Sequence, residues 1–189
     1  MTRSDNIYQI PKDLPVPIDD GACDHLAGMR VPSVPLHSTA GRSVDLATLP
    51  GRTVIYCYPR TGRPDVDPPQ DWNEIAGARG CTPQSCAFRD HFNELKALGA
   101  GVFGLSTQTT EYQREAAERL HLPFELLSDA DLTFAKALRL PTFQVESMTL
   151  IKRLTMIIRD ARIEKVFYPV FPPDKNAEEV SGWFSKNPR

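Results

Sequence analysis

Two cysteines five positions apart offer the clearest chemistry in this 189-residue sequence. Cys81 and Cys86 lie in the segment GARGCTPQSCAFRD, directly after a glycine and among arginines. The helical spacing of the apolar residues that follow predicts a helix that begins at Cys81. Unpaired backbone N–H groups and the helix dipole favour a thiolate at that position, and Arg79 and Arg89 are nearby cations. The sequence therefore predicts a reactive cysteine at Cys81.

The spacing of the two cysteines limits what they can do together. Five residues along an α-helix correspond to a rise of about 7.5 Å and a rotation of roughly 140°. A disulfide needs Cα atoms within about 7 Å, so an intact helix cannot hold a bridge between Cys81 and Cys86. The pattern suits a redox switch, in which one thiolate is oxidised and the second attacks the sulfenic acid after the first turn unwinds. The other interpretation makes Cys81 a small apolar residue of the helix.

Composition restricts the class of protein. The chain is 41% hydrophobic and 24% charged, with 22 basic and 24 acidic residues, which indicates a soluble globular protein with no nucleic-acid or membrane partner. Its apolar runs are far shorter than the roughly 20 residues that span a bilayer. The N-terminal sequence shows no secretory signal, so we expect a cytoplasmic location. Four cysteines in such a protein indicate thiol chemistry rather than a disulfide framework.

Apolar runs and helical periodicities alternate along the chain and predict an α/β fold. A last pair of apolar segments, interrupted at Asp160, predicts an antiparallel hairpin near the C-terminus. We expect a thioredoxin-like fold, with a central mainly parallel sheet flanked by helices. The expected strands cover residues 52–58, 100–106 and 124–129, the hairpin 153–160 and 162–170, and the helices 81–98, 109–122, 128–140 and 176–186.

Proline-rich stretches suggest additions to a single domain. Residues 1–30 are expected to form an irregular arm, and residues 31–189 one domain. Within it, residues 60–76 are expected to form a Pro-rich insertion. This insertion either covers the reactive cysteine or joins two copies of the chain through Trp72, or it is a packed surface loop.

The segment GCTPQSCAFRDHFNEL resembles the C-T-x-x-x-C-x-F-R-D signature of the Q-type, or bacterioferritin-comigratory, peroxiredoxins, which are thioredoxin-fold peroxidases. The segments VIYCYP, GVFGLST, LPFELLSD and KRLTMIIRDARIEKVF agree with it in order, and together they cover roughly residues 30–168. The resemblance implies that Cys81 is the peroxidatic cysteine and Cys86 the resolving one. It also implies that Arg153 polarises the peroxide. Gln84 takes the polar position three residues after Cys81.

One part of the family pattern is missing. The family carries P-x-x-x-T-x-x-C, whereas alanine and glutamate occupy the positions three and seven residues before Cys81. Pro59 lies 22 residues before this cysteine, which indicates an insertion of about fifteen residues. Three alternatives follow: Thr61 folds back and replaces the missing hydroxyl, Thr82 replaces it, or no residue does. We expect Thr61 slightly more than Thr82, because an insertion can leave the strand end in place.

These observations predict that the protein is a thiol-dependent peroxidase that reduces hydrogen peroxide or organic hydroperoxides. No flavin signature or phosphate-binding loop is present, so no cofactor is expected and a thioredoxin-like protein or small thiol must supply electrons. The alternatives are a redox-sensing thioredoxin-fold binding module and a thiol–disulfide oxidoreductase. Metal binding by Cys81 and Cys86 is the least favoured. Cys57 is expected in the core, and the chain is expected to be a monomer or a homodimer.

Overall fold

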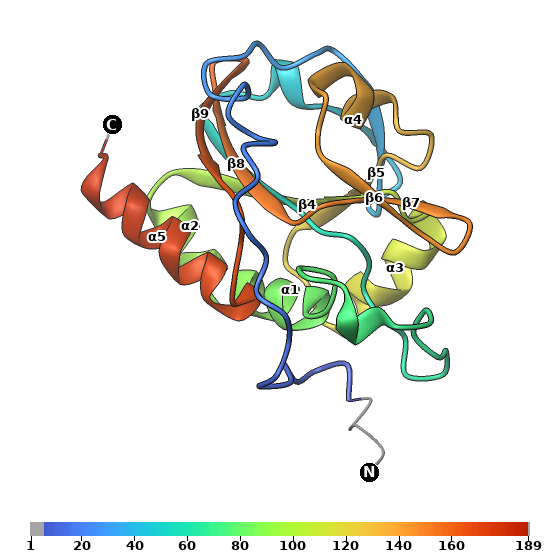
Figure 1. The fold of residues 1–189 in the computed structure, drawn as a ribbon. Helices are drawn as coiled ribbons and strands as arrows, with labels where there is room; N and C mark the ends of the chain where they lie inside the picture. Colours follow the sequence, from blue (N-terminus) through green and yellow to red (C-terminus); the bar gives the residue numbers. More distant parts are fainter. Residues whose placement is uncertain (1–5, 189) are drawn as a thin grey trace.

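The structure is a computed structural model that describes residues 6–188 (Figure 1). Residues 1–5, part of the expected arm, lie outside the described residues. The strands are β1 (Pro35–Ser38), β2 (Ser43–Asp45), β3 (Arg52–Cys57), β4 (Ala100–Ser106), β5 (Glu125–Ser128), β6 (Thr142–Val145), β7 (Met148–Ile151), β8 (Leu154–Arg159) and β9 (Arg162–Phe167). The α-helices are α1 (Cys81–Asp90), α2 (Phe92–Ala97), α3 (Thr110–Arg119), α4 (Thr133–Leu138) and α5 (Asn176–Lys186). Short 3-10 helices are η1 (Leu46–Thr48), η2 (Trp72–Glu74) and η3 (Pro173–Lys175).

Seven strands form one mixed sheet in the order β2-β1-β5-β4-β3-β8-β9. Its centre is parallel, because β4 pairs in parallel with both β3 and β5, and the C-terminal hairpin β8-β9 adds antiparallel strands beside β3. The expected thioredoxin-like α/β fold is confirmed. The sequence pattern did not predict β1 and β2 at the far edge, nor the separate hairpin β6-β7. These strands have three or four residues and no long apolar run, so they carry little periodic signal.

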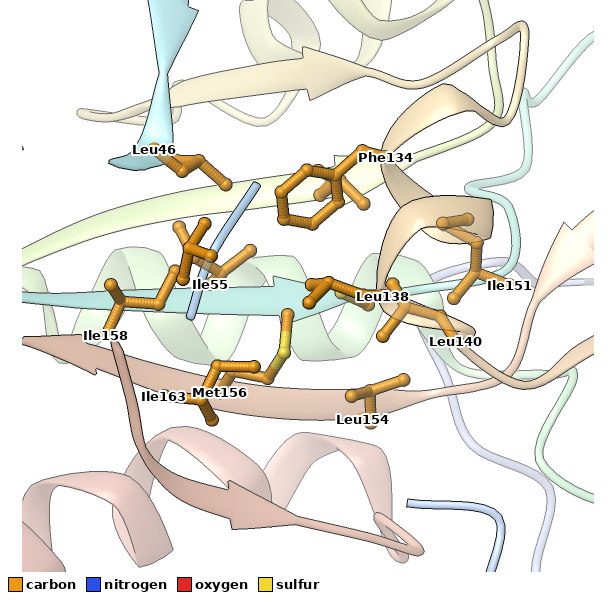
Figure 2. Close-up of a cluster of buried hydrophobic side chains, with 14 of the residues drawn as sticks. Leu46, Ile55, Phe134, Leu138, Leu140, Ile151, Leu154, Met156, Ile158 and Ile163 are labelled. Carbon is orange, nitrogen blue, oxygen red and sulfur yellow. The ribbon is translucent and has the colours of Figure 1, made fainter. Parts of the chain in front are cut away.

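Side chains of β3 alternate between two hydrophobic clusters, one on each face of the sheet. Val54 and Tyr56 pack into the cluster that includes α1, α2 and α5. Ile55 and Cys57 pack into the opposite cluster, which is closed by α4 (Figure 2). Gly104 on the neighbouring strand admits the Tyr56 ring, since a Cβ there would lie 2.7 Å from the Tyr56 hydroxyl oxygen. Cys57 thus lies in the core.

Three expected helices differ in their bounds. The single helix expected over 81–98 is broken at His91 into α1 and α2. The helix expected over 128–140 begins only at Thr133, because the Asp129 carboxylate accepts from the backbone N–H groups of Phe134 and Ala135. α3 begins as expected, since Thr109 Oγ1 accepts from Tyr112 N–H at 3.3 Å, but it ends at Arg119 rather than at residue 122.

Residues 6–34 run from the start of α1 to the β9 edge of the sheet (Figure 1). Within residues 6–30 there is no helix or strand, only a bridge between Arg30 and Arg162. Asp20 fixes the middle of this segment, because its carboxylate accepts from Lys152 Nζ at 2.8 Å and from the Tyr168 hydroxyl at 2.7 Å. No helix in the described part of the chain is long and apolar enough to cross a membrane.

Candidate active site

Gly80 sets the start of α1. Its φ of +105° lies in the left-handed region, and a Cβ there would lie only 2.7 Å from Pro173 Cγ. Glycine is therefore needed both for the backbone conformation and for the close approach of η3. The turn places Cys81 as the first residue of the helix, as the sequence predicts.

The Cys81 sulfur lies in a buried polar environment, and the residue is only 3% exposed. Its Sγ accepts from Arg60 N–H at 3.4 Å and from Arg153 Nη2 at 3.2 Å. As a thiol, Cys81 also donates to the Ala78 carbonyl oxygen at 3.6 Å. Arg60 follows the end of β3 and Arg153 directly precedes β8, so two neighbouring strands bring both donors to the helix start. Both donors stabilise a thiolate more than a thiol.

Neutral acceptors surround the Arg153 guanidinium. Nη2 donates to the carbonyl oxygens of Gly77, Ala78 and Arg79 at 3.0–3.2 Å, and Nη1 donates to Gln84 Oε1. Within residues 6–188 no carboxylate forms an ion pair with this side chain, which is 3% exposed. A buried guanidinium without a carboxylate favours an anion at the sulfur beside it.

Gln84 is itself held by the last helix segment. Its Nε2 donates to Asn176 Oδ1 at 3.0 Å, and the Thr155 hydroxyl donates to the same oxygen at 2.7 Å. Gln84 and Asn176 are at most 1% exposed. The network fixes Gln84, and through it the Arg153 guanidinium, with respect to Cys81. Sequence reasoning missed Asn176, since no local pattern links it to residues 92 positions away.

The two candidate threonines differ in their surroundings. Thr61 is fully buried, and its hydroxyl donates to Gln108 Oε1 at 3.2 Å. Thr82 directly follows Cys81, and its buried hydroxyl has no hydrogen-bond partner in the described part of the chain. Of the two hydroxyls, that of Thr82 is therefore the one without a partner among residues 6–188. Thr61 is already engaged with another side chain and does not line the cavity.

A cavity of about 220 Å³ lies over the sulfur. Its floor is formed by Arg79, Gly80, Cys81 and Thr82, and Arg60 and Tyr112 form one side. The rest of the wall comes from the N-terminal arm and from the Pro-rich segment: Asn6, Ile7, Tyr8, Gly62, Arg63, Pro64, Val66, Asp67, Pro68, Pro69 and Trp72. The cavity can therefore hold a small molecule against the thiolate.

Known proteins resemble the chain over most of its length. The Redoxin family model matches residues 26–181. The chain belongs to the Redoxin family. It is 31% identical over 155 residues to a chloroplastic peroxiredoxin Q from Sedum lineare, which covers 81% of this chain and 74% of the relative. It is 30% identical over 166 residues to peroxiredoxin Bcp from Escherichia coli K12. This alignment covers 85% of this chain and 96% of the relative.

A solved structure agrees with these relatives. The peroxidoxin BcpB of Mycobacterium tuberculosis superposes with a TM-score of 0.70 at 25% identity, over 86% of this chain and 98% of the other. The peroxiredoxin Q of Xylella fastidiosa, at 20% identity and the same TM-score, shares the fold. The chain is thus a peroxiredoxin of the Q/Bcp type, and the expected reaction class, a thiol-dependent peroxidase, is confirmed.

The second cysteine of this peroxiredoxin lies on the same helix as the first. Cys86 is half-buried, and no disulfide links it to another described cysteine. Burial raises the pKa of the Cys86 thiol, and the nearby Arg89 guanidinium opposes this rise. Arg89 therefore acts on Cys86. The expectation that it assists Cys81 finds no contact in the described structure, where Arg89 donates to Asp90 and to the Leu120 carbonyl oxygen.

The remaining cysteines lie away from the cavity. Burial raises the pKa of the Cys57 thiol strongly, and it raises the pKa of Cys23 to about 12 with help from neighbouring acids. Both stay protonated and unreactive at neutral pH. Among residues 6–188, no group of three or more His, Cys, Asp or Glu side chains is placed to hold a metal ion.

Proposed function

We propose that Cys81 is the peroxidatic cysteine of this peroxiredoxin. The supporting observation is that its buried sulfur accepts both the Arg60 N–H and the Arg153 guanidinium at the floor of a cavity. The thiolate attacks the terminal oxygen of a hydroperoxide, and the O–O bond breaks. An S–OH group forms, and the released alkoxide or hydroxide takes up a proton to leave as alcohol or water. Sulfur loses two electrons, which the peroxide gains.

Charge moves from sulfur to the two oxygens during this step. The transition state therefore needs hydrogen-bond donors beside both oxygens. In our proposal the Arg153 guanidinium and the Arg60 N–H supply two of them, since they already contact the sulfur. The free Thr82 hydroxyl supplies a third and takes the role that Thr61 was expected to fill. Gln84 keeps Arg153 in place.

We propose that Cys86 resolves the sulfenic acid. Its thiolate attacks Cys81 sulfur, the S–O bond breaks, and a disulfide forms while the released hydroxide takes up a proton to leave as water. The first turns of α1 must open for this, because the helix separates the two sulfurs. The contacts that would break include the Gln84 N–H bond to the Gly80 carbonyl at 3.0 Å and the Tyr56 hydroxyl bond to Ser85 at 3.1 Å.

The cycle closes when an external dithiol reduces the disulfide. A thioredoxin-like protein suits this role, because thiolate attack on an exposed disulfide is its chemistry. We propose a cytoplasmic enzyme, a location that the plant relative, named as chloroplastic, does not share. The arm and the Pro-rich segment cover the cavity of their own chain, which favours a monomer in which each chain works alone.

One experiment tests the assignment directly. Reduced protein receives one equivalent of hydrogen peroxide, and the cysteines are mapped by mass spectrometry. We expect a bridge between Cys81 and Cys86, seen as the loss of two hydrogens. Cys81→Ser should abolish peroxide consumption, whereas Cys23→Ser, which removes a thiol far from the cavity, should retain it. Normal turnover by Cys81→Ser would overturn the proposal.

A further inference from the structure

The chain leaves the central sheet just before it reaches the Cys81 sulfur. Tyr58 N–H still donates to the Leu105 carbonyl oxygen of β4 at 3.1 Å, so the hydrogen bonds between the two parallel strands continue just past β3. Pro59 follows, and proline has no N–H. The next N–H belongs to Arg60, and it donates to Cys81 Sγ at 3.4 Å rather than to β4. A donor to the reacting sulfur is therefore a backbone group of a loop.

The Arg60 side chain holds this loop only weakly. Its guanidinium extends to Tyr112, whose hydroxyl accepts from Nη2 at 3.2 Å, and to Met148, whose Sδ lies 3.6 Å from Nη1. Met148 lines a second cavity, apart from the one over Cys81. A phenol oxygen and a thioether are weak acceptors, and several rotatable bonds separate the guanidinium from the backbone. Another group must fix the direction of the Arg60 N–H.

Gln108 holds the next residue of the loop through three hydrogen bonds. Its Oε1 accepts from Thr61 N–H at 3.1 Å and from the Thr61 hydroxyl at 3.2 Å, and its Nε2 donates to the Thr61 carbonyl oxygen at 3.3 Å. The amide thus satisfies both backbone groups of one residue, as a neighbouring strand does within a parallel sheet. Thr61 is fully buried, so loss of these bonds would leave polar groups without a partner.

Gln108 is itself fixed by the ends of two strands. Its N–H donates to Ser106 Oγ at 3.3 Å, at the end of β4, and its carbonyl oxygen accepts from the Ser128 hydroxyl at 2.6 Å, at the end of β5. β3, β4 and β5 are parallel, so their C-terminal ends lie at the same edge of the sheet. The rigid edge of the sheet therefore carries the amide that holds the loop after β3.

We infer that Gln108 is a positioning residue of the peroxidase reaction. The peptide group between Arg60 and Thr61 contains the Thr61 N–H, which Gln108 binds. With this group fixed, the Arg60 N–H one residue earlier keeps its direction toward the Cys81 sulfur and toward the peroxide oxygen that approaches it. The inference rests on the proposed peroxidase function and on the role proposed there for the Arg60 N–H.

Two reactions of Cys81 in the same protein test this inference. Gln108→Met removes the amide and keeps the length of the side chain. The rates of Cys81 oxidation by hydrogen peroxide and of its alkylation by iodoacetamide are measured by quenching and mass spectrometry. A change in the sulfur itself affects both reactions, whereas only the peroxide reaction develops charge on an oxygen that needs an aligned donor. We expect the ratio of the peroxide rate constant to the alkylation rate constant to fall by about tenfold.

Two further variants serve as controls. Gln144→Met makes the same exchange at an exposed amide on β6, which donates to the Thr149 hydroxyl, and it should keep the wild-type ratio. Gln108→Glu keeps an acceptor for the Thr61 N–H and hydroxyl but loses the donor to its carbonyl oxygen, so it should retain more of the ratio than Gln108→Met. A wild-type ratio in Gln108→Met, or an equal loss in Gln144→Met, would overturn the inference.

Amide hydrogen exchange, followed by NMR, gives a readout without peroxide chemistry. In reduced Gln108→Met protein we expect the Arg60 N–H to exchange at least about tenfold faster than in the wild type, whereas the Tyr58 N–H, which β4 holds, should keep its protection. Gln108→Glu provides the same comparison if Gln108→Met does not fold. Unchanged protection of the Arg60 N–H would contradict the inference even if activity fell. If exchange responds as expected but the wild type consumes no peroxide, it is the proposed function that fails.

Discussion

Arg153 Nη2 lies 3.2 Å from Cys81 Sγ, although 72 positions separate the two residues in the chain. The remaining acceptors of this guanidinium are three carbonyl oxygens and the Gln84 side-chain oxygen, all of them neutral. When Cys81 ionises, its thiolate is therefore the anion in contact with a buried cation. The reactivity of Cys81 should therefore depend on the other acceptors of Arg153 being uncharged.

Gln84→Glu tests that connection. A carboxylate at this position would pair with Arg153 and repel negative charge at the Cys81 sulfur, so the sulfur should be a weaker nucleophile. We expect alkylation of Cys81 by iodoacetamide at pH 7 to slow by about tenfold. An equal alkylation rate in a variant with an unchanged circular dichroism spectrum would contradict the role of Gln84.

Thr82→Val separates the two candidate hydroxyls. This isosteric change removes the unpartnered hydroxyl beside Cys81, and we expect kcat/KM for hydrogen peroxide to fall by about ten- to a hundredfold. Thr61→Val removes only the hydroxyl bond to Gln108, so its cost should appear mainly in the free energy of unfolding. Steady-state kinetics and urea denaturation of both variants provide the comparison. A larger catalytic loss in Thr61→Val would restore the order expected from the sequence.

Disulfide formation should depend on pH through Cys86. Because burial raises the pKa of this thiol, its thiolate is scarce at neutral pH, and bridge formation should speed up as pH rises. Arg89 lowers the pKa of Cys86, so Arg89→Gln should raise that pKa further and slow bridge formation several-fold near pH 7. Rapid quenching with an alkylating agent, followed by mass spectrometry, measures the rate.

The control for this prediction is Arg114→Gln, which should leave the rate unchanged. The gap between Arg89→Gln and the wild type should close at high pH, where Cys86 is ionised in both proteins. A pH-independent defect would mean that Arg89 acts on the helix rather than on the thiol.

Gly80→Ala should destabilise the fold at the active site. The new Cβ would meet Pro173 at 2.7 Å in a left-handed backbone, and such strain costs about 1–3 kcal/mol. Gly182→Ala is the matched control, because a Cβ there meets nothing within 4 Å inside α5. This second change should stabilise the protein by about 0.5–1 kcal/mol. Equal urea midpoints for the two variants would show that Pro173 of η3 can move away from a Cβ at position 80 at little cost in the free energy of unfolding.

Local patterns in the sequence predicted a large part of this protein. The glycine and the apolar spacing after Cys81 predicted the start of α1, and the apolar runs predicted the central strands and the last hairpin. These features follow from backbone preferences and from periodic burial over a few residues, which a sequence shows directly. The family motif added the peroxidase class. The short hairpins β1-β2 and β6-β7 were not predicted, because strands of three or four residues show too little periodicity.

Contacts between distant segments were decided only by the tertiary structure. The sequence could propose Arg153 by motif, but the pairing of β3 with β8 is what brings it and Arg60 to the same sulfur. The same is true of the hydrogen bond between Asn176 and Gln84, and of the N-terminal arm that lines the cavity. A sequence determines its reactive thiol and the elements that carry it. Which donors reach that thiol depends on strand register and packing, because these set the distances between residues far apart in the chain.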